Sequence, residues 1–481
     1  MRKEREKMEE RKGFKSTFGF LMAAVGSAVG LGNIWGFPNK MGSNGGFAFL
    51  LVYLVLAVLC GYIVMVGELA IGRKTGKSAI ATYQTLSKKF KWLGWLATAS
   101  PFLILSFYCA LGGYCIKYIV LNVGNLFGAS FGTNGLSGGQ IFESFMLNQT
   151  EGVVFGIIFL LITMFIVMGG VSGGIEKFCS VGMPALAVML VVIIIRSCTL
   201  PGAVEGLKFM FMPNFEPLKE NFLGVLATAG GQMFFSLSLG MGVMITYGSY
   251  LDKQKDITKN ALVIVIFDTL VALMAGLAVL PAAFALDPGG KIGGPSLLFV
   301  TLQNVFDNMG SLGAVFGIIF YLLVILAAVS SSISLLEVLV THFCDKAVEK
   351  GKGDKRKVYS VIATVAAGAL CVLVCLDGLG YSGYWVPGRV LVDGAWQYTA
   401  MYNDCWLDFF DMLSEGIMMP LGALLMCLMI GYEIGPEVVR DEVEKSGGKM
   451  KSYGFFKICV RFITPILMAM VLIGQIKDFF L

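Results

Sequence analysis

Several polar side chains occur inside stretches that are otherwise apolar, and their chemistry suits an ion. Asp268 lies in the middle of ALVIVIFDTLVALMAGLAVLP, and the run ILAAVSSSISLLE is interrupted by Ser330, Ser331, Ser332 and Ser334. A carboxylate at the centre of a bilayer costs about 3 kcal/mol unless it is paired or hydrated, so Asp268 indicates a functional site. Serine hydroxyls also bond to the preceding turn of their own helix, which leaves the serine cluster open between a binding and a structural role.

Two glycine-rich stretches are unsuited to a continuous helix: GSAVGLGNIWGFP at 26–38 and GGQMFFSLSLGMG at 230–242. Backbone groups freed at such breaks find no partner in hydrocarbon, so something polar must occupy the gap. Freed oxygens suit a hard cation such as sodium, and amides at the start of a half-helix suit an anion such as a substrate carboxylate. Close helix packing through Gly26 and Gly30 is the alternative, but it does not explain the accompanying polar residues.

The composition indicates that the elements carrying these residues cross a membrane. The chain has 481 residues, of which 56% are hydrophobic and 14% charged, whereas soluble domains carry about 25% charged residues. The net charge of +5 does not indicate a nucleic-acid partner, because the Lys and Arg residues are spread between apolar segments. The eleven cysteines lack C-x-x-C spacing, so no metal or redox site is predicted from them. The lipid bilayer is therefore the expected partner.

Eleven segments are long and apolar enough to span a bilayer, and they predict an all-α polytopic membrane protein. The segments are 17–40, 46–72, 93–125, 152–170, 176–197, 225–250, 258–285, 310–345, 357–377, 405–433 and 453–477. The two glycine-rich breaks fall in the first and sixth segments. Interruptions at matching positions in two halves are typical of transporters built from inverted repeats, here two of five helices each.

The distribution of basic residues predicts the orientation. Tracts 1–16, 73–92 and 346–356 are rich in Lys and Arg, and 126–151 has neither. Because cytoplasmic loops carry the excess of cations, the N-terminus is expected in the cytoplasm and, with eleven spans, the C-terminus outside. The predicted organisation is a cytoplasmic segment 1–16, a first repeat 17–197, an external loop 198–224, a second repeat 225–433, and 453–481 as the eleventh helix and external end.

Several motifs resemble the neurotransmitter:sodium symporter family, and the resemblance runs from about Arg11 to Ile476. They are GSAVGLGNIWGFP, NGGFAFLLVYL, GELAIGR, LPGAVEGLKF, GGQMFFSLSLGMGVMITYGSYL, GGPSLLFVTL, AAVSSSISLLE and MMPLGALL. The eleven spans match bacterial members of the family. The resemblance implies the LeuT-like fold, the inner membrane of a prokaryote, and sodium-coupled uptake of an amino acid by alternating access.

The resemblance also implies the residues of the site. A first sodium site is expected at Ala28, Asn33, Ser236 and Asp268, and a second at Gly26, Val29, Ala327, Ser330 and Ser331. The substrate carboxylate is expected at Leu31, Gly32 and Tyr108, and its amine at Ala28, Phe234 and Ser238. The rest of the pocket is expected from Gly30, Ile104, Leu111, Phe235, Ser236, Met241, Ser332 and Leu335.

Two positions bear on ligands. Gly30 stands where monoamine-transporting relatives have an aspartate, so a glycine favours an amino acid, and the mostly apolar pocket favours a hydrophobic or aromatic one. Asp268 stands where chloride-dependent relatives have an asparagine, with Tyr53, Gln232 and Ser236 at the other positions around chloride. A fixed carboxylate substitutes for the halide, so chloride independence is expected.

The gates follow the family in part. Arg11, Asp345, Phe14 and Tyr250 match the inner gate, and Phe235 and Asp411 match the outer one. The family's outer-gate arginine is replaced by Gly36, so we expect Lys40 or Arg389 to compensate Asp411, or the substrate to carry a cation or extra bulk. Gly174 and Pro184 match a Gly-x9-Pro pattern in the fifth span, which predicts either an inner end that unwinds or a static kink.

Other functions remain as alternatives. A symporter of an amine or cationic substrate fits the missing arginine, a sodium-gated channel fits the same oxygen ligands, and a non-transporting sensor fits the altered outer gate. An enzyme is not expected, because the single histidine, His342, sits at the end of a span and is better explained as an interfacial histidine whose hydrogen bonds are satisfied.

Overall fold

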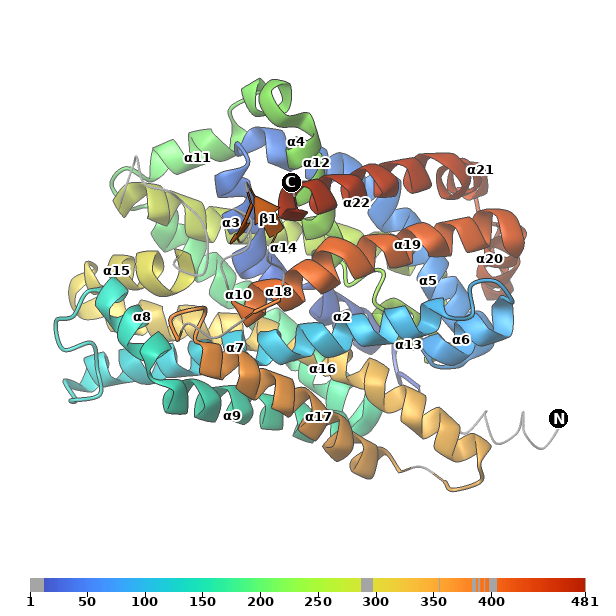
Figure 1. The fold of residues 1–481 in the computed structure, drawn as a ribbon, viewed down its shortest axis with the longest axis horizontal. Coiled ribbons are helices and arrows are strands. Elements are labelled where there is room, and N and C mark those ends of the chain that lie inside the picture. The colour runs from blue at the N-terminus through green and yellow to red at the C-terminus, as the bar shows by residue number, and fades with distance from the viewer. Residues whose placement is uncertain are drawn as a thin grey trace.

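The computed structural model of the chain describes residues 13–286, 297–353, 355–382, 386–387, 390–392, 394–397 and 405–480. Long helices lie side by side and form one bundle around a continuous apolar core (Figure 1). At one end of the bundle lie the short helices α8 (Gly138–Leu147), α11 (Ala203–Phe211) and α15 (Leu302–Asp307). At the other end lie α6 (Ala79–Leu86), α13 (Val243–Ser249) and α20 (Glu437–Val443).

Within the described residues, nine helices are long and apolar enough to cross a membrane. They are Phe47–Thr75, Leu93–Phe127, Gln149–Met168, Val171–Cys198, Ile257–Leu286, Gly313–Glu349, Arg356–Asp377, Trp406–Glu433 and Tyr453–Lys477. A tenth is the bent pair Thr17–Ala28 and Gly32–Ser43. These agree with ten of the predicted segments to within about six residues at either end. The expected sixth span divides into α12 (Glu216–Ser236) and α13, so length and apolarity alone do not reach eleven.

Five spans are single α-helices, and five others include a π-helical segment, a feature often found at functional sites. The single ones are α7 (Leu93–Phe127), α9 (Gln149–Met168), α14 (Ile257–Leu286), α16 (Gly313–Glu349) and α17 (Arg356–Asp377). The first composite span consists of α2 (Thr17–Ala28), η1 (Gly32–Gly36) and α3 (Phe37–Ser43), and the second of α4 (Phe47–Leu56), η2 (Ala57–Gly61) and α5 (Tyr62–Thr75). The fifth span consists of η3 (Val171–Ile175) and α10 (Glu176–Cys198). The tenth consists of α18 (Trp406–Asp411), η6 (Met412–Met418), α19 (Met419–Leu428) and η7 (Met429–Glu433), and the eleventh of α21 (Tyr453–Ile458), η9 (Cys459–Ile463) and α22 (Thr464–Phe480).

Large apolar side chains cover the outside of the bundle. Phe165 on α9, Val181 on α10 and Val365 on α17 are 65%, 71% and 68% exposed. Soluble proteins rarely leave extended apolar surfaces in water. The exposed faces of these helices therefore fit contact with lipid, which agrees with the composition.

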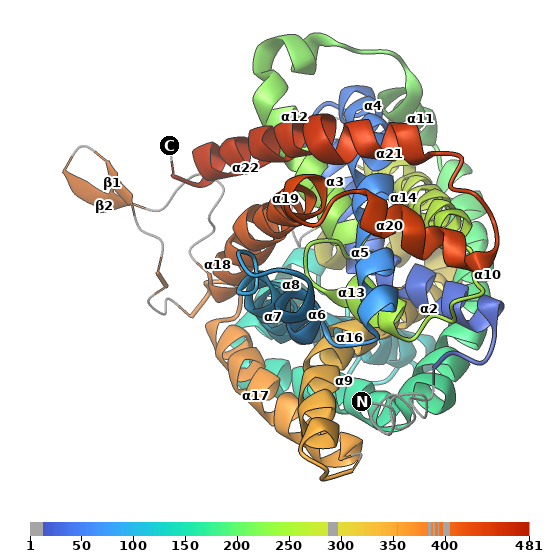
Figure 2. The same ribbon diagram turned by 90° about the vertical axis from the view of Figure 1, so that its right-hand side faces the viewer.

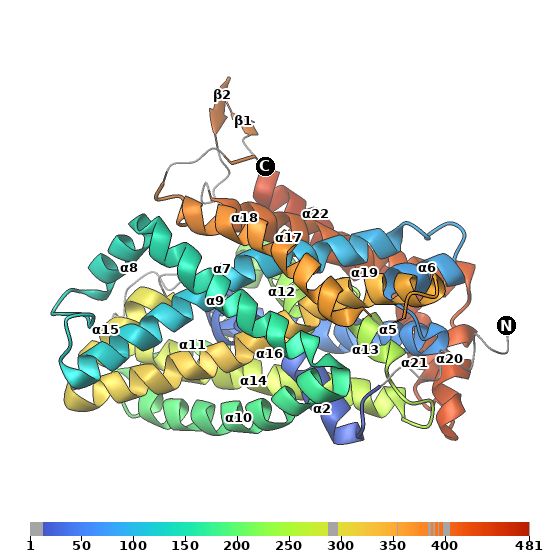
Figure 3. The same ribbon diagram turned by 90° about the horizontal axis from the view of Figure 1, so that it is seen from below.

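The described residues are helical, as expected, apart from one short hairpin. The strands β1 (Val390–Val392) and β2 (Ala395–Gln397) pair antiparallel, with Val392 opposite Ala395, and the hairpin projects from the helical body (Figures 2 and 3). The sequence VLVDGAWQ has an Asp-Gly pair between two short apolar runs, which is a strong hairpin signal. The hairpin lies within the long 378–404 loop.

Candidate functional site

The first break separates α2 from η1 and bends the chain by 46°. α2 ends at Ala28, and Val29 takes an extended conformation with φ −75° and ψ 98°. The side chain of Asn33 replaces one lost helical partner, because its Oδ1 accepts the amide of Gly30 at 3.1 Å. The carbonyls before the break and the amides after it are thus released from regular helical pairing.

The second break separates α12 from α13 and needs glycine. Gly240 and Gly242 have φ values of +77° and +71°, a region that side chains rarely adopt. The buried carboxylate of Glu68, on α5, accepts the amide of Gly240 at 2.8 Å and so stabilises the unwound segment. The hydroxyl of Ser238 donates to the carbonyl of Ser27 at 2.9 Å, which joins the two breaks directly.

Asp268 lies fully buried on α14 and faces both breaks. Its carboxylate accepts Asn33 Nδ2 at 2.8 Å and the hydroxyl of Ser236 at 2.9 and 3.0 Å. Tyr53 donates to the same carboxylate at 3.2 Å. Three of the residues expected at the first sodium site therefore lie together, beside the break that follows Ala28. A carboxylate, an amide oxygen, a hydroxyl and a free carbonyl form a ligand set that suits a hard cation.

The serines of α16 meet the backbone of the first break. Ser331 donates to the carbonyls of Gly26 at 3.3 Å and Ser27 at 3.1 Å. Ser330 donates to the carbonyl of Ala327 at 2.8 Å and lies 3.5 Å from that of Val29. All the residues expected at the second sodium site are brought together. Their oxygens are backbone carbonyls and serine hydroxyls, which carry no net charge and therefore suit a monovalent cation better than a divalent one.

A small cavity lies between the breaks and is lined by Ser27, Ala28, Gly30, Gly32, Ile104, Tyr108, Phe235, Ser238, Met241, Ser331 and Leu335. Five expected substrate-binding residues are buried but do not line it: Leu31, Leu111, Phe234, Ser236 and Ser332. The hydroxyl of Ser332 bonds instead to Thr163 of α9 at 2.7 Å. Ser27, which the sequence analysis did not include, lines the cavity and pairs with the hydroxyl of Ser334 at 2.7 Å.

One end of this cavity is polar and tightly shaped. The amide of Leu31, just after the first break, donates to the hydroxyl of Tyr108 at 2.8 Å, so a backbone donor and a phenol meet at one point. A Cβ atom on Gly30 would lie 2.4 Å from that hydroxyl and 2.3 Å from Ser331 Oγ. Ile104, Phe235, Met241 and Leu335 form the apolar part of the lining. Such a cavity suits a small molecule with an anionic group at one end and an apolar group at the other.

At the end of the bundle that holds α15, an ion pair joins the first and tenth spans. Lys40 of α3 pairs with Glu415 of η6, and the side chains are 22% and 8% exposed. Asp411, one turn earlier, lies beside both of them. We expected Lys40 to compensate the charge of Asp411, but its ammonium pairs directly with Glu415 and only lies beside Asp411. Arg389, the other expected partner, lies outside the described residues.

At the opposite end, Tyr250 takes part in a buried network. Its hydroxyl donates to Glu337 Oε1 at 2.7 Å and lies 2.8 Å from the hydroxyl of Thr341. Arg356 pairs with the other oxygen of Glu337 at 2.6 Å. Asp345 accepts the amide of Ser78 at 2.7 Å. Arg11, the expected partner of Asp345, lies outside the described residues.

The start of the fifth span is tied to the first. Gly174 lies in η3, and Pro184 lies inside α10, which continues as a helix through it. Glu176, at the start of α10, accepts the amide of Lys15 at 2.8 Å and the hydroxyl of Ser16 at 3.0 Å. Any unwinding at this end must therefore release the N-terminal end of α2 as well.

Sequence reasoning missed three acids that the structure places at the two ends: Glu176, Glu337 and Glu415. Glu337 and Glu415 each lie in an apolar run, so the rule that singled out Asp268 applied to them too. The cations paired with Glu337 and Glu415 are 19 and 375 residues away in the chain, and Ser16 is 160 residues from Glu176, so no local pattern indicates those contacts.

Three comparisons bear on these features. A model of the sodium:neurotransmitter symporter family matches residues 11–130 and 144–386. An uncharacterized sodium-dependent transporter of Bacillus subtilis is 36% identical over 469 residues, which are 96% of this chain and 97% of that protein. One of Methanocaldococcus jannaschii is 30% identical over 476 residues, covering 96% and 90%. The solved structure of MhsT in complex with L-phenylalanine superposes with a TM-score of 0.83 at 36% identity, covering 97% of this chain and 100% of that one.

Proposed function

Because the chain belongs to the sodium:neurotransmitter symporter family, we propose that it takes up a hydrophobic or aromatic amino acid together with sodium by alternating access. The observation that carries the proposal is the joint position of the two helix breaks. They share one cavity, with the Asp268 carboxylate on one side and the α16 serines on the other. Oxygens for a cation and donors for an anion thus adjoin a single apolar space.

We propose two sodium ions. Ala28, Asn33, Ser236 and Asp268 would hold the first, and Gly26, Val29, Ala327, Ser330 and Ser331 the second. The first site lies next to the substrate cavity, since Ala28 belongs to both. Binding of sodium and of substrate then favour each other by the same factor, which is what coupling requires.

The proposed substrate is an amino acid with an apolar side chain. Its carboxylate would accept from the amides of Leu31 and Gly32 and from the Tyr108 hydroxyl, and its amine would donate to the carbonyls near Ala28, Phe234 and Ser238. Ile104, Met241 and Leu335 would surround the side chain. The phenylalanine bound by MhsT supports an aromatic substrate. Because residue 30 is a glycine and not an aspartate, the protein has no carboxylate at this position, and the substrate must bring its own.

We propose that transport does not require chloride. The Asp268 carboxylate accepts hydrogen bonds from Tyr53 and Ser236. These are two of the residues at the positions that would surround chloride in chloride-dependent members of the family. Gln232 points its amide nitrogen to the carbonyl of Gly32 at 2.7 Å. A fixed negative charge at this point balances the sodium ions without a halide.

The membrane arrangement follows from the same proposal. α12 and α13 together would form the sixth span, which completes eleven, and the spans 17–197 and 225–433 would form two inverted repeats. The N-terminus would lie in the cytoplasm and the C-terminus outside the inner membrane of a prokaryote. The end with Tyr250 is then cytoplasmic, and the end with Lys40 and Glu415 is external.

Two sets of polar residues, one at each end of the bundle, would close the outer and inner paths to the cavity. Lys40 and Glu415 would close the outer path in place of the family's arginine, with Phe235 covering the cavity and Asp411 beside the pair. Tyr250, Glu337 and Arg356 would close the inner path, together with Asp345. A gate needs to bias one conformation against the other by only a few kcal/mol.

Purified protein in sealed vesicles tests the proposal. With an inward sodium gradient we expect accumulation of radiolabelled phenylalanine or leucine above the external concentration, unaffected when gluconate replaces chloride. No accumulation of any amino acid, with intact sodium-dependent binding, would instead favour a sensor.

A cationic or amine substrate is the second candidate. One observation favours it: Asp411 and Glu415 place two carboxylates against one lysine at the outer end. Uptake of lysine or of an amine that competes with phenylalanine would support this candidate. A sodium current that is not stoichiometric with substrate flux would indicate a channel.

A further inference from the structure

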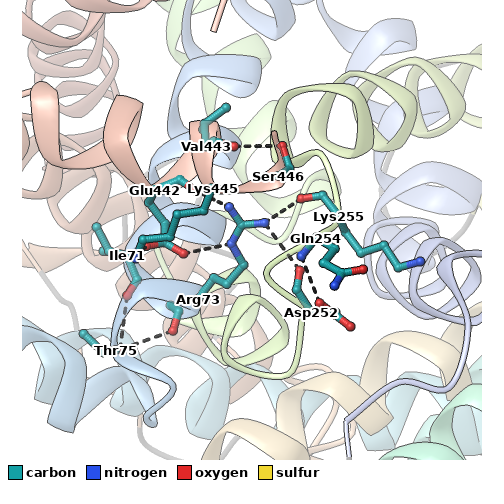
Figure 4. A network of polar contacts seen from close by, with 11 residues as sticks. Ile71, Arg73, Thr75, Asp252, Gln254, Lys255, Glu442, Val443, Lys445 and Ser446 are labelled. Atoms are coloured by element: carbon teal, nitrogen blue, oxygen red, sulfur yellow. Dashed lines mark hydrogen bonds and ion pairs between the residues drawn. The ribbon is translucent and has the colours of Figure 1, made fainter. Parts of the chain in front are cut away.

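A second buried ion pair lies at the end of the bundle that holds α13 and α20, outside the proposed site (Figures 1 and 4). Arg73, on the last turn of α5, donates through Nε to Oε1 of Glu442 at 3.0 Å and through Nη2 to the Glu442 carbonyl. Its Nη1 donates to the carbonyls of Lys255 at 2.5 Å and Asp252 at 3.4 Å. The two charged side chains are 1% and 0% exposed. We call these four residues the Arg73 cluster.

The Arg73 cluster joins three segments that are remote in sequence. Arg73 belongs to α5, Glu442 to α20, and the two carbonyls to the loop 250–256 between α13 and α14. All three lie together at one end of the bundle (Figures 1 and 4). A planar guanidinium reaches a carboxylate and several carbonyls at once, which a lysine ammonium on the same stem cannot do.

The other side of the same loop faces α16 and α17. There the Tyr250 hydroxyl meets Glu337 and Thr341, and Glu337 is held by Arg356. The loop therefore lies between two buried ion pairs. Its backbone is bound by Arg73 on one side, and its tyrosine reaches Glu337 on the other.

The two sides differ in what their separation would expose. Opening the Arg73 cluster would leave the buried Arg73 without any of its acceptors, and Glu442 would keep only the half-exposed Lys445. An unpaired buried charge is among the costliest changes in a protein interior. Separating Tyr250 from Glu337 breaks hydrogen bonds of a hydroxyl, while Glu337 keeps Arg356. Opening this end of the bundle therefore costs less free energy if the segments separate between Tyr250 and Glu337 than if they separate at the Arg73 cluster.

Building on the alternating access proposed above, we propose that Arg73 and Glu442 are positioning residues for the inner seal. They stay joined throughout the cycle and hold the loop so that Tyr250 meets Glu337. The helix α20, between the tenth and eleventh spans, consequently moves together with α5 and α13, and away from α16 and α17.

Distance measurements test this directly. Spin labels are placed, through an unnatural amino acid because the chain has eleven cysteines, at the exposed positions Asp441 on α20, Lys74 on α5 and Lys357 on α17. Between sodium-loaded and sodium-free protein we expect the 441–357 distance to change and the 441–74 distance to stay constant. A change in 441–74 as large as that in 441–357, or no change in 441–357, would overturn the proposal.

Variants test the positioning role. Arg73→Lys keeps the charge but loses the carbonyl contacts, so we expect uptake to fall about tenfold, with sodium-dependent substrate binding retained within about threefold and greater labelling of the cavity from the inner side. Lys445→Gln is the matched control, because Lys445 pairs with the same carboxylate at 2.5 Å but is 45% exposed. We expect it to transport normally.

A charge exchange separates this role from simple ion pairing. Arg73→Glu combined with Glu442→Arg restores the pair but not the bonds to the loop carbonyls, so we expect uptake to stay low; full recovery would contradict the proposal. Glu442→Asp keeps the carboxylate and is expected to recover most of the uptake lost in Glu442→Gln. If the unaltered protein binds sodium and amino acid but never transports, the proposed function fails, while the two label distances still report on the Arg73 cluster.

Discussion

Asp268 places a fixed negative charge between the two breaks, and its replacement is the most informative single change. Asp268→Asn keeps the shape and removes the charge that balances sodium. We expect sodium-driven uptake without chloride to fall at least about tenfold, equal to about 1.4 kcal/mol, and to recover when chloride is added. Uptake in vesicles with chloride or gluconate measures this.

Asp441→Asn is the matched control, because it makes the same substitution at a side chain that is 59% exposed. We expect it to leave uptake unchanged. An Asp268→Asn protein that keeps its sodium dependence without chloride would contradict both the charge argument and chloride independence.

Gly30 tests the shape of the cavity. Gly30→Ala places a methyl group 2.3 Å from Ser331 Oγ and 2.4 Å from the Tyr108 hydroxyl. Overpacking of this kind costs about 1–3 kcal/mol. Here it falls on Tyr108, which is proposed to receive the carboxylate, and on Ser331, which is proposed as a sodium ligand. We expect substrate affinity to drop at least about tenfold in a binding assay. Gly173→Ala is the control, since nothing lies within 4 Å of its added Cβ; equal losses in both variants would refute the assignment.

At the scale of elements, the pair Lys40–Glu415 links α3 to η6. Lys40→Gln leaves the nearly buried Glu415 without its cation, a change that costs about 3 kcal/mol when a pair is fully buried. We expect the outer path to stay open more of the time, measured as faster labelling of a cysteine introduced at the external mouth, with uptake reduced.

The exchange Lys40→Glu with Glu415→Lys is expected to restore closure in part, because the charges can pair again across the same two elements. Lys208→Gln is the control at the same end, since its pair with Glu205 is within one exposed helix. A labelling rate that is unchanged in Lys40→Gln would exclude this pair as a gate.

At the scale of the molecule, the ligands should stabilise the whole bundle. The ion and substrate sites are built from α2, α12, α14 and α16, so occupancy joins helices that are otherwise held by packing. A ligand at about one hundred times its dissociation constant adds about 2.7 kcal/mol. We expect a thermal shift with phenylalanine and sodium together that exceeds the sum of the two separately.

The control for this measurement replaces sodium with potassium at equal ionic strength. Equal shifts in the two salts, or a shift with phenylalanine that ignores sodium, would contradict coupled binding.

Much of the architecture could be predicted from the sequence, for physical reasons that are local. A span needs a run of apolar residues, and such runs are visible in the chain, as the agreement of ten segments shows. A break needs residues that tolerate unusual backbone, and Gly240 and Gly242 supply them. Asp268 and the α16 serines were recognisable because a polar group in an apolar run needs a partner. The sixth span, predicted as one segment at 225–250, is divided by the second break into α12 and the seven-residue α13.

Pairing across the bundle could be decided only by the tertiary structure. The sequence placed Asp411 at the outer gate and suggested Lys40, but which of two acids one turn apart receives the ammonium depends on how α3 and η6 face each other. The same holds for Ser332, which turns to Thr163 rather than to the cavity, and for Arg73, whose partners are 179 to 369 residues away. Apolar periodicity and glycine placement are properties of short segments, so the sequence alone determined the membrane fold and the breaks. Contacts between charged groups depend on the rotation and height of each helix, so only the assembled bundle decided them.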